Sequence, residues 1–128
     1  MSIAITHIGV YVKDLEITRK FYETYFGAKS NQKYVNSKGF SSYFLTFDSG
    51  ARLELMANVA LEYREPMEIV NGWSHLAFSV GSEEEVLELT KRIEEAGYQI
   101  YSAPRHTGDG YFESCVADPD GNRVEITT

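Results

Sequence analysis

His7-Ile8-Gly9-Val10-Tyr11-Val12 returns as His75-Leu76-Ala77-Phe78-Ser79-Val80, 68 positions further along the chain. A second pair of matching segments, Arg52-Leu53-Glu54-Leu55 and Arg123-Val124-Glu125-Ile126, is separated by 71 positions. Loops of unequal length account for the small difference between these two distances. Because an internal repeat decides the architecture before any single residue does, we interpret the chain as two copies of one unit.

The first copy changes its hydrophobic period along the chain. Residues 3–12 alternate as a strand does. A four-residue period follows, and it predicts a helix that buries Ile17 and Phe21. Asp14 is placed to cap the start of this helix, and Gly27 is placed to end it in a left-handed conformation.

The second copy has the same order of elements. Ser82 and Glu85 have the spacing of a capping box at the start of a helix, and Gly97 ends that helix. Further strand patterns follow each helix, at residues 34–35, 42–47 and 51–57 in the first copy and 99–101, 111–117 and 123–127 in the second. Each copy is therefore predicted to be βαβββ, which makes the fold class α+β with mixed sheets.

The length of 128 residues predicts one domain made of two modules, residues 1–66 and 67–128. Pro66 and Gly72 mark the join between the modules. A module of about 60 residues is too small to bury a core comfortably by itself. We therefore expect the modules to pack together or against a partner chain.

The composition excludes several classes of partner. A net charge of −7 repels polyanions, so nucleic acid is excluded as a partner. No apolar run approaches the ~18 residues of a membrane span, and residues 1–7 lack the pattern of a secretion signal, so we predict a cytoplasmic protein. Cys115 is the sole cysteine, which suits a reducing compartment, and we interpret it as a packing residue rather than a nucleophile.

Strand alternation predicts that four chemically useful side chains share one kind of surface. His7, Glu54, His75 and Glu125 lie on the polar faces of their strands, opposite the apolar residues. If the two sheets curl towards one another, these four side chains converge in a cleft. Two imidazoles and two carboxylates suit a divalent transition metal, and an octahedral ion would keep two positions open for water or substrate.

A structural interpretation of the same residues is also open. A single strand histidine is more often hydrogen-bonded than a ligand, and Glu54 and Glu125 could pair with the neighbouring Arg52 and Arg123. The recurrence of His and Glu on the same strand and face in both copies favours the four-ligand metal site.

Paired βαβββ modules with His in each first strand and Glu in each last strand resemble the vicinal oxygen chelate superfamily (glyoxalase/bleomycin resistance/dioxygenase), and most closely its glyoxalase I-like members. The most specific matching segments are Lys13-Asp14-Leu15 and Phe21-Tyr22 after His7, and residues 118–125. The resemblance implies a cupped, partly open barrel with outer helices around one divalent ion of nickel, cobalt or zinc. It also implies a homodimer whose metal ligands can come from two chains.

The resemblance further implies a reaction on the hemithioacetal of a thiol and a small α-oxoaldehyde such as methylglyoxal. A proton leaves the carbon next to a carbonyl, and the negative charge that develops must be stabilised. The resemblance identifies Glu125 as the base and Glu54 as the partner that returns the proton.

Tyr11, Arg105 and Tyr111 are the candidates for binding the substrate. Glyoxalase I has an arginine four residues after its first metal ligand, for the glutamyl carboxylate of glutathione, and this chain has Tyr11 there, so glutathione is not implied. Arg105 could bind an anion in a loop over residues 105–110, although a plain surface turn is the alternative. His106 has no counterpart in the first copy and is left out of the metal shell. Four aromatic side chains could line a pocket: Tyr43, Phe44, Trp73 and Tyr111.

Other activities share this fold. An epimerase of an acyl-coenzyme A thioester would use the same metal and carboxylates with a larger pocket. A metal-free antibiotic-binding protein, like the bleomycin-resistance members, would hold a cationic drug without the ligand set. Ring-cleaving dioxygenases and thiol transferases usually need only three protein ligands, so the fourth argues against both.

Overall fold

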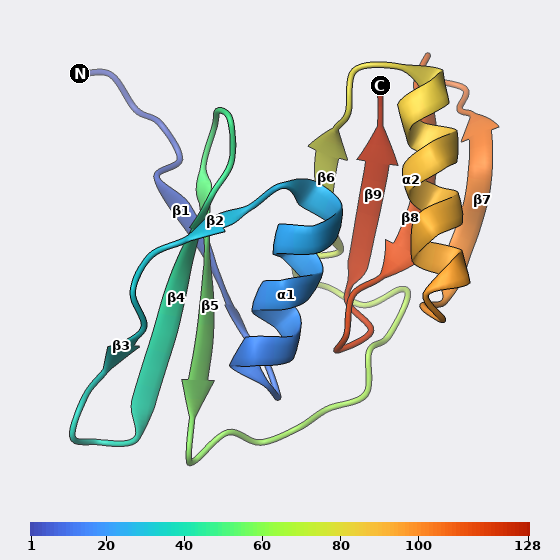
Figure 1. Ribbon diagram of the computed structural model, residues 1–128. Helices are drawn as coiled ribbons and strands as arrows, with labels where there is room; N and C mark the ends of the chain where they lie inside the picture. The colour runs from blue at the N-terminus through green and yellow to red at the C-terminus, as the bar shows by residue number, and fades with distance from the viewer. The chain divides into compact units, whose positions relative to one another are not determined.

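The computed structural model describes residues 1–128, and its contacts divide the chain into two compact units, Met1–Arg64 and Glu65–Thr128 (Figure 1). The boundary lies next to Pro66, where the sequence predicts the join of the modules. Neither helix is long and apolar enough to cross a membrane.

The first unit is a five-stranded sheet with one helix. Its elements in chain order are β1 (His7–Tyr11), α1 (Leu15–Phe26), β2 (Lys29–Ser30), β3 (Tyr34–Val35), β4 (Phe40–Thr46) and β5 (Arg52–Asn58). The sheet order is β1-β5-β4-β2, with β3 paired to β4. Strands β1 and β5 are parallel, whereas β4 runs antiparallel to β5.

The second unit repeats this plan with four strands. Its elements are β6 (His75–Ser79), α2 (Glu83–Glu95), β7 (Ile100–His106), β8 (Phe112–Ala117) and β9 (Arg123–Thr127), and its sheet order is β6-β9-β8-β7. His75 pairs with Arg123 in the parallel β6–β9 ladder, just as His7 pairs with Arg52 in the β1–β5 ladder. The α+β class and the repeated module are confirmed.

Three details differ from the predictions. Residues 3–6 are not in a strand, and Ile3 and Ile5 are exposed because no neighbouring strand extends to meet them. The two-residue strand β2 was not expected. Ile17 is 54% exposed, because α1 buries the stripe that contains Leu15, Thr18 and Tyr22 instead.

The helix ends are as predicted. The Asp14 carboxylate accepts a hydrogen bond from the Ile17 amide at 3.0 Å, and the Ser82 hydroxyl accepts one from the Glu85 amide at 3.2 Å. Gly27 follows α1 with φ of 67°, the left-handed conformation that ends many helices.

Each sheet packs one face against its helix, and the other face carries the histidine and glutamate side chains. In the second unit, α2 packs on β7, β8 and β9 (Figure 1), and its Thr90 hydroxyl lies 2.7 Å from that of Ser114. The side chains of Val116, Val124 and Ile126 on this face are fully buried. The alternation of each strand therefore sends Glu125 to the opposite face.

We predict that Gly27→Ala destabilises the protein by about 1–2 kcal/mol, since a Cβ carries that cost in the left-handed region. An added Cβ would meet no atom within 4 Å at Gly27, so the loss comes from backbone conformation alone. Gly108→Ala is the matched control, because that position is equally open and has no positive φ. Urea unfolding of the three proteins measures the difference, and an equal stability of the two variants would contradict the prediction.

Candidate functional site

The first unit brings His7 and Glu54 together on adjacent strands. Gly9 pairs with Glu54 in the β1–β5 ladder, so His7 and Glu54 project from the same face. His7 Nε2 lies 3.8 Å from Glu54 Oε1, with the side chains 40% and 17% exposed. The Phe44 ring meets the His7 ring edge to face, with centroids 5.2 Å apart, and provides an apolar wall beside the imidazole.

The second unit has the same arrangement. Ala77 pairs with Glu125 in the β6–β9 ladder, and His75 Nε2 lies 3.2 Å from Glu125 Oε1. The His75 and Glu125 side chains are 40% and 24% exposed. Cys115, the cross-strand neighbour of Glu125, occupies the place that Phe44 has beside Glu54. The Cys115 side chain is buried, and this burial raises the pKa of the thiol, which suits a packing residue.

Each imidazole also has a hydroxyl at its other nitrogen. Thr6 Oγ1 lies 2.9 Å from His7 Nδ1, and Ser74 Oγ lies 3.0 Å from His75 Nδ1. Sequence reasoning missed both hydroxyl groups. The available signal was a hydroxyl residue directly before the histidine in each copy of the repeat.

The neighbouring arginines are engaged elsewhere, which removes the simplest structural explanation of the two glutamates. The Arg52 guanidinium lies 4.3 Å from the centre of the Phe44 ring. Arg123 lies 4.2 Å from the centre of the Tyr101 ring and 3.8 Å from a Glu68 carboxylate oxygen. Glu54 and Glu125 instead face histidines.

The donor chemistry fits a divalent transition metal. Each unit offers one imidazole nitrogen and one carboxylate, the neutral and anionic donors that such ions accept. The structure contains no group of three or more His, Cys, Asp or Glu side chains that could hold a metal ion. A pair supplies only two donors, so the four-ligand set of His7, Glu54, His75 and Glu125 stays a prediction.

The surroundings of Glu125 raise the pKa of its carboxyl group above the ordinary value. Burial raises its pKa most, and a hydrogen bond to the Glu113 carboxyl raises it further, while the charges of His75 and Arg105 act in the opposite direction. Glu113 was missed by sequence reasoning, although strand alternation places it on the face of Cys115. A carboxylate with a raised pKa accepts a proton more readily, which suits a general base.

Arg105 and His106 lie in β7, so the predicted loop over residues 105–110 is wrong in its first two residues. The Arg105 guanidinium donates a hydrogen bond to Ser102 Oγ at 2.7 Å, and His106 Nε2 lies 3.4 Å from Glu83 Oε1. Tyr111 precedes β8 and is half exposed. The side chain of Tyr43 lies in the core rather than in a pocket, and its hydroxyl donates to a Glu16 carboxylate oxygen at 2.9 Å.

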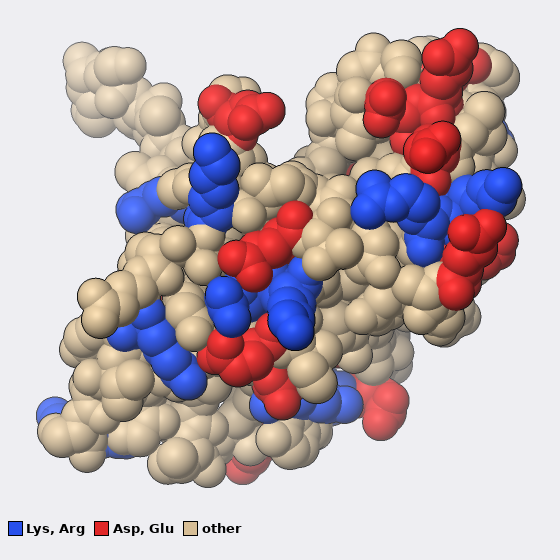
Figure 2. Space-filling view, in the orientation of Figure 1, with Lys and Arg blue, Asp and Glu red and all other residues tan.

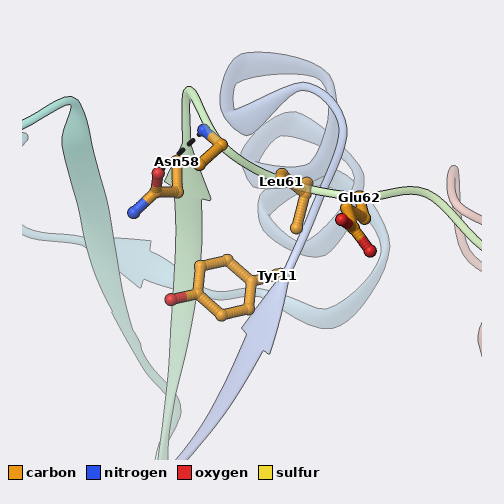
Figure 3. A pocket seen from close by; sticks show the side chains of 5 residues that line it. Tyr11, Asn58, Leu61 and Glu62 are labelled. Carbon is orange, nitrogen blue, oxygen red and sulfur yellow. Dashed lines mark hydrogen bonds between the residues drawn. The ribbon is translucent and has the colours of Figure 1, made fainter.

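Tyr11 and Asn58 lie on the face of the first sheet that carries His7 and Glu54. Each is four residues further along its strand, about 13 Å at ~3.3 Å per residue. The two side chains line a cavity of about 270 Å³ with Ala60, Leu61 and Glu62 (Figure 3). Such a volume holds part of a small molecule. Trp73, the remaining pocket candidate, is 98% exposed.

On the face shown in Figure 2, acidic and basic side chains are interspersed on each unit. Three salt bridges at α1 link Glu16 and Glu23 with Arg19 and Lys33. Interspersed charge of this kind forms no basic stripe along which a polyanion could lie on this face.

Comparison with known proteins gives one family and several activities. The family model for the Glyoxalase/Bleomycin resistance protein/Dioxygenase superfamily matches residues 4–126. A probable trivalent organoarsenical cleaving enzyme of Bacillus subtilis is 35% identical over 94% of this chain and 76% of its own length. The metallothiol transferase FosB of Bacillus licheniformis is 27% identical over 98% of this chain and 75% of its own. The crystal structure of glyoxalase I from Zea mays matches this structure with a TM-score of 0.79 and 26% sequence identity. The match covers 97% of this chain but only 44% of the maize chain.

Proposed function

The chain belongs to the Glyoxalase/Bleomycin resistance protein/Dioxygenase superfamily, and we propose that it is a metal-dependent lyase of the glyoxalase I type. Its substrate would be the hemithioacetal of a thiol and a small α-oxoaldehyde such as methylglyoxal. The observation that carries this proposal is the repeated pair of an imidazole facing a carboxylate, at 3.8 Å in one unit and 3.2 Å in the other.

Superfamily members generally use a divalent metal ion. We propose that His7, Glu54, His75 and Glu125 hold one such ion of nickel, cobalt or zinc. When bound, the ion supplies a positive charge that stabilises the negative charge developing on the substrate oxygens.

Proton transfer is the work of the two carboxylates. In the proposed reaction, the C–H bond next to the carbonyl breaks and its proton moves to the Glu125 carboxylate. The electron pair of that bond enters the neighbouring carbonyl, whose oxygen takes up the negative charge. Glu54 then takes the proton of the substrate hydroxyl and donates it to the adjacent carbon, while the proton held by Glu125 goes to the oxygen on that carbon, so both carboxylates end as they began. In the metal-free protein, burial raises the pKa of Glu125, which supports its choice as the proton acceptor.

We propose that the protein is a homodimer. A second chain would then cover apolar surface that a small module cannot bury by itself. Superfamily members commonly form dimers and bind small molecules. Arg105 and Tyr111 are proposed as substrate contacts, as is Tyr11, and the cytoplasm as the location.

The decisive assay compares reactions on one preparation. The purified chain is stripped with a chelator, reloaded separately with nickel, cobalt or zinc, and supplied with methylglyoxal and several thiols. We expect hemithioacetal turnover that disappears on stripping and returns on loading. Loaded protein that instead transfers a thiol, epimerises an acyl-coenzyme A thioester or only binds an antibiotic would contradict the proposed reaction.

The Tyr11 cavity predicts poor use of glutathione. A carboxylate of the substrate would meet the Glu62 carboxylate there and no arginine. We therefore expect Tyr11→Arg to raise kcat/KM for the glutathione hemithioacetal about tenfold, because one charge-assisted hydrogen bond contributes ~1.5–3 kcal/mol.

Tyr34→Arg is the matched control, since Tyr34 is an exposed tyrosine of β3. The same kcat/KM ratios are measured with a thiol that lacks carboxylates, for which neither variant should gain. A gain with both thiols, or with neither, would exclude the cavity as the site of the thiol's distal end.

A further inference from the structure

Both histidines of the candidate site have the same two partners. A hydroxyl lies at Nδ1, from Thr6 at 2.9 Å in one unit and from Ser74 at 3.0 Å in the other. A carboxylate faces Nε2, from Glu54 and Glu125 respectively. The same arrangement occurs at the start of β1 and at the start of β6. It is therefore a property of the repeated unit.

We propose that Thr6 and Ser74 are positioning residues that present Nε2 of each imidazole to a divalent metal ion. The inference rests on the proposed function only for the binding of that ion at these histidines. A nitrogen that binds a metal must offer its lone pair, so the other nitrogen carries the proton and needs an acceptor. Each hydroxyl oxygen is in place to accept the Nδ1 proton.

A hydroxyl has a further advantage over a carbonyl group as this partner. Without metal, Nε2–H can face the glutamate, at 3.2 Å in the second unit and 3.8 Å in the first, while Nδ1 accepts a hydrogen bond from the hydroxyl. With metal at Nε2, Nδ1–H donates to the same hydroxyl oxygen. A carbonyl oxygen only accepts, so it would leave Nδ1 without a donor in the first state. The hydroxyl therefore gives Nδ1 a hydrogen-bond partner in both tautomers.

The backbone of the first unit supports this role. The Thr6 carbonyl oxygen accepts a hydrogen bond from the Arg52 amide at 3.0 Å, which ties Thr6 to the strand that carries Glu54. The hydroxyl and the carboxylate that flank His7 are thus fixed to the same pair of strands. Rotation of the imidazole away from its present position would break the contact between Nδ1 and the Thr6 hydroxyl.

The test measures metal affinity of the full chain. We expect Thr6→Val and Ser74→Ala each to weaken binding of zinc or nickel by about 10- to 100-fold, the usual effect of losing a partner of a metal-binding histidine. Thr6→Ser and Ser74→Thr should restore most of the affinity, because they keep the hydroxyl. Competition titrations with a coloured chelator at one fixed pH give these affinities.

Two control variants each remove a hydroxyl that does not contact a histidine. Thr46→Val and Ser79→Ala each remove a hydroxyl that donates to a main-chain carbonyl oxygen, at 3.2 Å and 3.1 Å. Both should leave metal affinity unchanged. A second measurement uses the metal-free protein: nitrogen-15 spectra of the imidazoles should change for His7 in Thr6→Val and for His75 in Ser74→Ala.

The outcomes separate this inference from the proposed function. Unchanged metal affinity in Thr6→Val and Ser74→Ala overturns the positioning role and leaves the lyase proposal intact. Weakened binding with hydroxyl rescue, in a protein without hemithioacetal turnover, supports the positioning role and overturns the lyase. A chain that binds no divalent ion overturns both.

Discussion

Glu125→Gln should lower kcat by about 10²- to 10⁴-fold, the range that loss of a general base produces. The amide oxygen of glutamine still binds a metal ion, but the amide does not accept the substrate proton at neutral pH. Metal affinity should therefore fall much less than turnover. Stopped-flow measurement of hemithioacetal turnover, with metal content determined on the same sample, tests the separation.

Glu113→Gln is the graded comparison. The Glu113 carboxyl hydrogen-bonds to Glu125 and raises its pKa, and a glutamine amide that donates to Glu125 would weaken it as a base. We expect a loss of turnover that is clearly smaller than that of Glu125→Gln. Full activity of Glu125→Gln would remove Glu125 as the base, and equal losses in both variants would make the two carboxyls a joint acceptor.

The parts of the fold that could be predicted are those encoded locally. The Asp14 and Ser82 caps and the left-handed Gly27 depend on a few neighbouring residues, and all three were confirmed. The strands that carry His7 and His75 could be placed because each has a copy elsewhere in the chain. Ile17 was misplaced because two overlapping helical stripes fit α1, and the packing against the sheet selects one of them.

In the candidate site, too, the features encoded locally could be predicted, and those that depend on neighbouring strands could not. Alternation along one strand predicts which face carries Glu125, but it does not give the strand that lies beside it. Glu113 becomes visible as a partner only with the antiparallel register of β8 and β9. The Thr6 and Ser74 contacts depend on side-chain rotamers, which a hydrophobic pattern does not encode. Arg105 was assigned to a loop because β7 contains register shifts and shows no clear alternation.

Removing either imidazole should remove the whole metal site rather than half of it. If His7 and His75 bind one shared ion, His7→Ala and His75→Ala should each reduce affinity by more than the about 10- to 100-fold that loss of a partner hydroxyl costs. Turnover should fall to background in both variants. If each unit bound its own ion, each variant would keep one ion, and equilibrium dialysis with metal analysis separates these cases.

Mixing the two inactive variants tests whether one site uses two chains. In a homodimer whose sites each combine the first unit of one chain with the second unit of the other, a His7→Ala chain and a His75→Ala chain complete one intact site between them. After denaturation and joint refolding of equal amounts, about a quarter of the sites are then whole, because half of the dimers are mixed and each has one intact site. About a quarter of wild-type turnover should return. No recovery in mixed dimers, verified by a mass tag on one variant, would place all four ligands within a single chain, since each chain then lacks one imidazole of its own site.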